Sequence, residues 1–181
     1  MKKLLIAISL LVLTQLNAAT LEKITMPDSM KIAGKTLVLN GLGLRQATIF
    51  KVDVYVGGLY VTTKSKDQKV ILDQLGPKFI NMHFVRDVSK SKLNGGWEDA
   101  FDNAVKNQTK LKTRMERFYK MMEDIKENQE IKITFFDDKV NVVFNGKNKG
   151  DILGADFSKA LLAVWFINAS DEGLRDGLLG K

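Results

Sequence analysis

The sequence "GLGLRQATIFKVDVYVGGLYV" at residues 41–61 combines a glycine-rich start, one arginine and a long apolar segment. Its first residues are similar to a phosphate-binding glycine loop, but Gln46 replaces the third glycine of the dinucleotide fingerprint. Such a loop also leads into a helix, whereas the residues that follow here favour a strand. The motif G-x-x-x-x-G-K-S/T occurs nowhere in the chain. We therefore interpret residues 41–45 as a glycine-rich turn between two strands.

The apolar segment after this turn alternates with a period of two. Val52, Val54 and Val56 fall on one face of an extended chain, and Asp53 and Tyr55 fall on the other. This spacing predicts a strand with one buried face and one distinct face. The pattern also leaves Asp53 available to pair with a lysine or an arginine.

Arg45 stands where the glycine-rich turn enters this strand, so its side chain can point into the mouth of a cavity. A guanidinium stays charged, and its planar fork suits a carboxylate or an enolate. Tyr55, on the same strand, adds a second hydrogen-bond donor. Together the two side chains predict the polar end of an apolar pocket. The alternative is an ordinary surface arginine and a core tyrosine.

The other segments predict strands in hairpin-like runs with helices grouped between them. Strands are expected around Gly34, at residues 78–88 and at residues 130–153, with a hairpin at Asp137-Asp138. Helices are expected at residues 67–76, after the capping residue Ser89, along the apolar stripe of residues 111–125, and in two segments within 156–180. This order indicates an α+β fold with a mainly antiparallel sheet.

The first nineteen residues have the layout of a secretory signal peptide. Lys2 and Lys3 precede an apolar run, which is too short to span a bilayer comfortably, and small residues follow it. We expect cleavage after Ala18 or Ala19, with an uncleaved anchor as the alternative. Residues 20–181 are then one domain, which is exported and is periplasmic if the source is a Gram-negative bacterium. No membrane span is expected after removal of the signal.

Composition excludes several classes of chemistry. The chain has no cysteine, so disulfides, zinc–thiolate sites and cysteine nucleophiles are ruled out. The single histidine, His83, is more typical of a hydrogen-bonded structural residue than of a catalytic base. The net charge of +7 includes Lys2 and Lys3, and the remaining cations alternate with acids, so we expect no nucleic-acid partner. No cofactor and no metal are expected, and we expect a monomer.

Three segments of the chain together resemble a known protein family. Residues 41–61, the junction "FVRDVSKSKLNGGWEDAF" at residues 84–101 and the closing segment at residues 150–180 resemble chalcone isomerase-like proteins, in the same order along the chain. The resemblance implies an open-faced β-sandwich, in which a large, mainly antiparallel sheet carries a layer of helices and a ligand cleft lies between them. True chalcone isomerases cyclise a chalcone without a cofactor. Other members lack this activity, and some bind fatty acids.

The resemblance also assigns candidate site residues. Arg45 matches the arginine that steadies developing negative charge in the enzymes, and Tyr55 replaces a threonine that organises an active-site water. Trp97 stands at the position of a tyrosine on the central helix. Ala104 stands at the position of an asparagine, with Asn103 next to it. The arginine is therefore retained, while most of its polar partners are replaced.

This pattern predicts a non-catalytic binder of a small amphipathic ligand such as a fatty acid, held by Arg45, Tyr55, Trp97 and Asn103. One alternative is a cofactor-independent isomerase, or intramolecular lyase, of unknown substrate. It would act through Arg45 and Tyr55, with Asn103 or His83 assisting. Another is an interaction protein whose cleft is filled by its own side chains. An open apolar cavity at Arg45 would favour the first two, and a closed core would favour the third.

Overall fold

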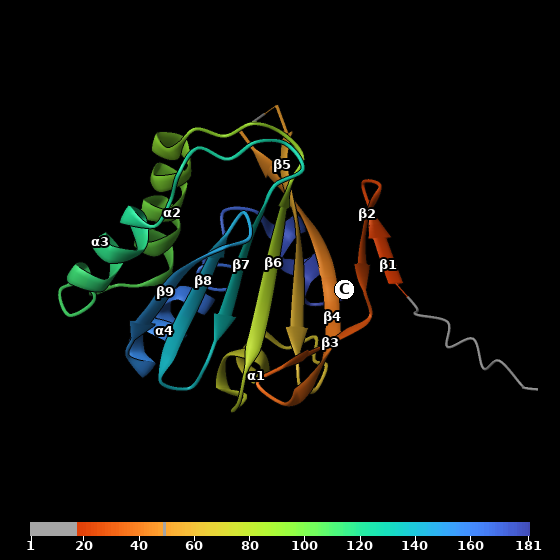
Figure 1. Cartoon of the computed structure of the whole chain (residues 1–181), viewed down its shortest axis with the longest axis horizontal. Helices are drawn as coiled ribbons and strands as arrows, with labels where there is room; N and C mark the ends of the chain where they lie inside the picture. Colours follow the sequence, from red (N-terminus) through yellow and green to blue (C-terminus); the bar gives the residue numbers. More distant parts are fainter. Residues whose placement is uncertain (1–17, 49) are drawn as a thin grey trace, which may run out of the picture.

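A seven-stranded antiparallel sheet forms the centre of the molecule (Figure 1). The computed structural model describes residues 18–48 and 50–181. Each strand pairs with the next one along the chain, as expected when successive strands are joined by hairpins or local excursions. In order across the sheet the strands are β3 (Ser29–Ile32), β4 (Lys35–Ala47), β5 (Val52–Val61), β6 (Lys78–Phe84), β7 (Glu130–Phe135), β8 (Lys139–Phe144) and β9 (Lys147–Leu153).

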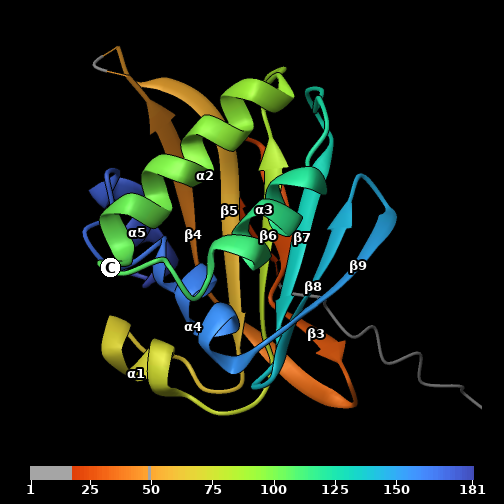
Figure 2. The ribbon, with the colours of Figure 1, turned by 90° about the vertical axis from the view of Figure 1, so that its left-hand side faces the viewer.

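The helices cover one face of this sheet (Figure 2). Alternate residues of β5 to β8 point toward them and form the main core, because side chains alternate between the faces of a strand. No helix in the described part of the chain has the length and apolar composition needed to span a membrane. The helices are α1 (Gln68–Asp73), α2 (Lys90–Ala104), α3 (Lys112–Lys120), α4 (Ala155–Ala163) and α5 (Glu172–Leu178).

A small hairpin covers part of the opposite face (Figure 1). It consists of β1 (Ala18–Leu21) and β2 (Ile24–Pro27), and it packs over a second apolar cluster that includes Met26, Val56 and Tyr60. Ala18 and Ala19, where we place the signal cleavage, are the first residues of β1, and residues 1–17 lie outside the described part. Cleavage after Ala19 would leave two residues of β1 paired with β2.

The glycine-rich stretch is not a turn, which corrects the interpretation made from the sequence. Residues 41–45 lie inside β4 and pair with β5, so that Gly43 faces Gly57 and Arg45 faces Tyr55 across the two strands. The turn between these strands comes later and includes residues 48, 50 and 51, where Thr48 and Lys51 have φ values of 65° and 50°.

Helix α5 explains why glycines occur inside this strand. A Cβ atom at Gly43 would overlap the backbone oxygen of Leu174, and one at Gly41 would overlap that of Gly177. Asn40, next to Gly41, donates its side-chain amide to the carbonyl of Leu178 at 2.8 Å. The absence of side chains therefore lets the backbone of α5 lie directly on β4, and this contact sets the position of the segment before α5.

We expect Gly43→Ala to lower the free energy of unfolding by about 1–3 kcal/mol, because the new methyl group meets backbone that cannot move aside. Urea unfolding followed by circular dichroism measures the change. Gly95→Ala is the matched control, since a Cβ atom at that helical position meets open space and should raise stability by up to about 1 kcal/mol. Equal stability of Gly43→Ala and the wild type would contradict the close packing of α5.

The other predicted elements are present with shifted ends. Ser89 caps α2 as predicted, with its hydroxyl accepting from the backbone N–H of Lys92. The apolar stripe of residues 111–125 is buried throughout, but the helix within it ends at Lys120. Ile125 instead forms an isolated bridge with Val88. The periodically spaced apolar residues are therefore buried beyond the end of the helix that their spacing predicts.

Candidate binding cavity

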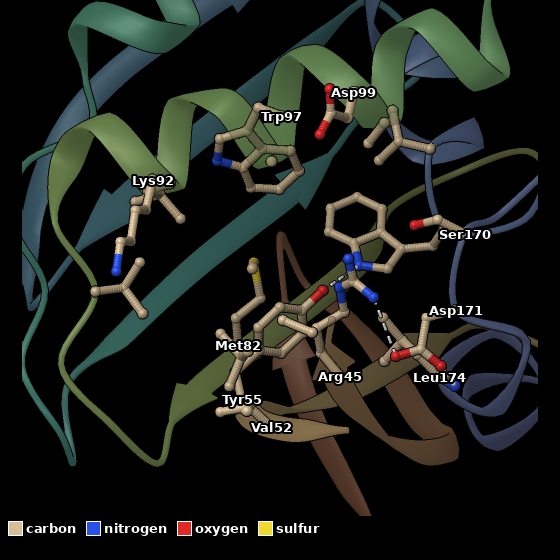
Figure 3. Close-up of a pocket in the computed structure, with 18 of the residues that line it drawn as sticks. Arg45, Val52, Tyr55, Met82, Lys92, Trp97, Asp99, Ser170, Asp171 and Leu174 are labelled. Carbon is tan, nitrogen blue, oxygen red and sulfur yellow. Dashed lines mark hydrogen bonds and ion pairs between the residues drawn. The ribbon is translucent and has the colours of Figure 1, made fainter. Parts of the chain in front are cut away.

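A cavity of about 900 Å³ lies between the sheet and helix α2 (Figure 3). Strands β4 to β6 form its floor, α2 forms its roof, and the segment between α4 and α5 closes one side. Its inner wall is largely apolar, with Val54, Met82, Phe84 and Leu93 among the lining residues. Charged side chains also line the cavity, including Arg86, Lys92, Asp99 and Asp102. The volume is within the range of small-molecule sites in proteins.

An irregularity in the pairing of β4 with β5 shapes the cavity floor. Arg45 pairs with Tyr55 and Gln46 pairs with Asp53, so Val54 has no partner on β4. A bulge of this kind shifts the alternation of side chains. As a result Val54 and Tyr55 both line the cavity. The prediction that Val54 and Val56 share a face is therefore wrong, because Val56 is buried on the opposite side of the sheet.

Arg45 lies at the side of the cavity nearest α5. Its Nη1 donates to the backbone oxygen of Gln46 at 2.8 Å and to Oδ2 of Asp171 at 3.2 Å. Within residues 18–48 and 50–181, its Nε and Nη2 atoms donate no hydrogen bond. The side chain keeps 28% of its surface exposed, although Asp171 is only 13% exposed. Arg45 therefore combines a structural ion pair with free N–H groups.

Asp171 also belongs to the site, although its position in the sequence did not predict this. It caps α5, with Oδ1 accepting from the N–H of Leu174 at 2.9 Å. Its Oδ2 also accepts from the N–H of Gln46 at 2.7 Å. One carboxylate thus joins the start of α5 to the end of β4 and to the guanidinium of Arg45.

Tyr55 is buried at the same end of the cavity. Its hydroxyl oxygen accepts a hydrogen bond of 3.2 Å from the indole N–H of Trp165, another residue missed by the sequence analysis. Burial raises the pKa of Tyr55 to about 12, although the Trp165 hydrogen bond and the charge of Arg45 act in the opposite direction. The phenol therefore stays protonated at physiological pH. Its O–H donates to no acceptor in the described part of the chain.

The two remaining predicted site residues come from α2. Trp97 is buried in the cavity roof, where its ring packs edge-on against Phe118 and Trp165, with centroid distances of 4.9 and 5.4 Å. Asn103 lies at the exposed rim, and its backbone oxygen accepts from the side-chain amide of Asn168 at 3.0 Å. The structure thus brings Arg45, Tyr55, Trp97 and Asn103 around one cavity. Their part in ligand binding remains a prediction.

His83 lies away from this cavity. On β6 it lies between Met82 and Phe84, whose side chains point into the main core. The side chain of His83 is therefore on the opposite face of the sheet. Its Nδ1 is 3.6 Å from a carboxylate oxygen of Glu130. Within residues 18–48 and 50–181, Asp53 forms no ion pair with a lysine or an arginine, and its carboxylate accepts from the side-chain amide of Gln46 at 2.8 Å. Neither side chain joins Arg45 and Tyr55.

The comparisons with known proteins agree with this geometry. The model of the chalcone isomerase-like family matches residues 18–180. No curated protein matches the sequence of the chain. The crystal structure of a fatty-acid binding protein of Arabidopsis thaliana is similar in fold, with a TM-score of 0.71 and 16% sequence identity over 91% of this chain and 97% of that one. The family model matches almost the whole chain, and the structure has a large antiparallel sheet with helices on one face and a cavity between them. The chain therefore belongs to the chalcone isomerase-like family.

Proposed function

We propose that the protein binds a small amphipathic acid, such as a fatty acid, as a monomer and without changing it chemically. The observation that carries this proposal is the cavity, which joins an apolar interior to a cluster of hydrogen-bond donors. Apolar walls favour a hydrocarbon chain, because burial removes its surface from water at about 25 cal/mol per Å². The donors provide the specificity for one polar end.

The polar end suits a carboxylate. The free N–H groups of Arg45 and the O–H of Tyr55 are donors, and ionised carboxylates are acceptors only. Hydrogen bonds between charged partners are about twice as strong as neutral ones. Asp171 neutralises part of the charge on Arg45, so the ligand binds a guanidinium that is already held in place. The bound carboxylate therefore meets a preorganised site.

Two further observations support binding over the alternatives. The fatty-acid binding protein of Arabidopsis thaliana shares the fold. The isomerase alternative relied on His83 or Asn103 for assistance, and His83 lies on the other face of the sheet while Asn103 is exposed at the rim. An interaction protein with a filled cleft is disfavoured by the open cavity.

Export is part of the same proposal. Its support is the sequence of residues 1–19, with two lysines, an apolar run and small residues before β1. An intact mass measured on protein purified from the periplasm of a Gram-negative host tests this point. A mature chain that begins at Ala19 or Thr20 is expected, and a full-length chain found only in the cytoplasm would contradict it.

Ligand binding is tested by solvent extraction and mass spectrometry of the purified mature protein. We expect fatty acids in near-stoichiometric amounts, and we expect delipidated protein to bind a fluorescent fatty acid in competition with palmitic acid. Bovine serum albumin provides the positive control for extraction. Protein that carries no lipid and binds neither palmitic acid nor the fluorescent acid would contradict the proposal.

A further inference from the structure

Helix α2, the roof of the cavity, has two adjacent glycines near its middle, Gly95 and Gly96. Glycine weakens the interior of a helix, because its backbone loses more conformational freedom on folding than that of any other residue. In β4 glycine is required because the backbone of α5 lies directly on the strand. A Cβ atom at Gly95 or Gly96 instead meets no atom within 4 Å, and neither residue has a φ in the left-handed region. The packing of the fold therefore gives no reason for either glycine.

Only Gly96 of this pair lines the cavity. It forms a stripe along α2 with Lys92, Asp99 and Asn103, at spacings of four, three and four residues, and these residues also line the cavity. Figure 3 shows Lys92 and Asp99 on the two sides of Trp97 along the helix. Gly96 is exposed, as expected of a residue whose backbone faces an open cavity. A side chain at this position would therefore project from the roof over the cavity.

Gly95 occupies a different stripe of α2. Ser91 and Glu98, four residues before it and three residues after it, are exposed, and neither lines the cavity. A side chain at residue 95 would therefore point to solvent. The two glycines share one helical environment and differ in their position relative to the cavity.

The next residue on the cavity side of α2 is also small. Ala100, one turn after Gly96, lines the cavity with a single methyl group. Leu93 and Trp97 are larger, and both are buried in the inner part of the roof. The roof therefore has little side-chain volume at Gly96 and Ala100, which leaves space for a ligand next to the helix backbone.

We propose that Gly96 sets the width of the ligand that the cavity accepts, because the hydrocarbon chain of the ligand lies against the backbone of α2 at this residue. The inference rests on the proposed function and specifies the chain, which can carry methyl branches as well as being straight. Dispersion contacts between the chain and the helix backbone require close approach, and a side chain at residue 96 would prevent it. Gly96 is thus a specificity-determining residue of the cavity.

The test measures the affinity of the delipidated mature protein for two acids with the same main-chain length. Palmitic acid is straight, and 3,7,11,15-tetramethylhexadecanoic acid is its methyl-branched counterpart. We expect the wild type to bind both. Gly96→Leu should weaken binding of the branched acid at least tenfold more than that of palmitic acid, because the new side chain takes the space of the branches. Gly96→Ala should change the ratio in the same direction by a smaller factor.

Gly95→Leu and Gly95→Ala are the matched controls and should leave both affinities unchanged. The alanine variants at both positions should raise the temperature of thermal unfolding by about 2–4 °C, so a loss of ligand in Gly96→Ala cannot result from unfolding.

Three results would overturn the inference while leaving the proposed function in place. They are an unchanged ratio of affinities in Gly96→Leu, an equal change of the ratio in Gly95→Leu, and a wild type that binds palmitic acid but excludes the branched acid. Failure of both acids to bind the wild type would instead reject the proposed function, and the inference with it.

Discussion

A fatty acid is expected to bind the Arg45→Ala variant about ten- to a hundredfold more weakly than the wild type. The expected loss corresponds to one charge-assisted interaction of about 1.5–3 kcal/mol between a guanidinium and a carboxylate in a site with restricted access to water. Arg45 is suited to this role because only Nη1 is engaged by Gln46 and Asp171, so the rest of the fork can meet the ligand. Isothermal titration with palmitic acid measures the change.

Three controls separate ligand binding from structural damage. The alcohol with the same chain has no charge, so Arg45→Ala should weaken its binding far less than that of the acid. Arg45→Lys keeps the charge without the planar fork and should bind the acid with intermediate affinity. Arg117→Ala removes an exposed arginine of α3 outside the cavity and should bind normally. Equal losses for acid and alcohol in Arg45→Ala would show that Arg45 only supports the fold.

Much of the sheet and of the helical layer could be predicted from the sequence because burial imposes a local period. Strands β7 and β8 alternate strictly between buried and partly exposed residues, and this alternation is visible in the sequence. The glycines of β4 were misinterpreted because their cause is not local. Asn40 and Leu178, which mark the contact between β4 and α5, are 138 residues apart. A glycine required by such a contact cannot be distinguished from a turn glycine by its neighbours in the sequence.

The residues of the candidate site were likewise only partly predictable from the sequence. Arg45 and Tyr55 were predicted because both break an apolar pattern on adjacent stretches of chain. Asp171 and Trp165 were not assigned to the site, because they reach it through contacts across 126 and 110 residues. Each also had an adequate local explanation, as a helix cap and as part of an apolar helix. The bulge at Val54 was missed too, because a change in pairing between strands leaves no mark on the alternation within one strand.

Asp171 is expected to have opposite effects on folding and on ligand binding. Asp171→Ala should lower the free energy of unfolding by about 2–4 kcal/mol, because it removes the cap of α5 and leaves the N–H of Gln46 without its acceptor. Asp67→Ala is the matched control, since Asp67 caps α1 with a single bond to the N–H of Lys69 in an exposed position. It should cost about 1 kcal/mol.

For the protein that remains folded, Asp171→Ala should strengthen fatty-acid binding by about three- to tenfold. The carboxylate of Asp171 lies beside the Arg45 guanidinium, which the ligand also uses. Its removal therefore relieves repulsion between this carboxylate and that of the ligand, and it frees Nη1 from Asp171. The alcohol with the same chain should gain little, which makes the ratio of acid to alcohol affinity the informative measurement. A ratio that falls, as in Arg45→Ala, would mean that Asp171 serves mainly to hold Arg45 in position. A ratio that rises while stability falls would show that the site gives up some ligand affinity to keep α5 attached to β4.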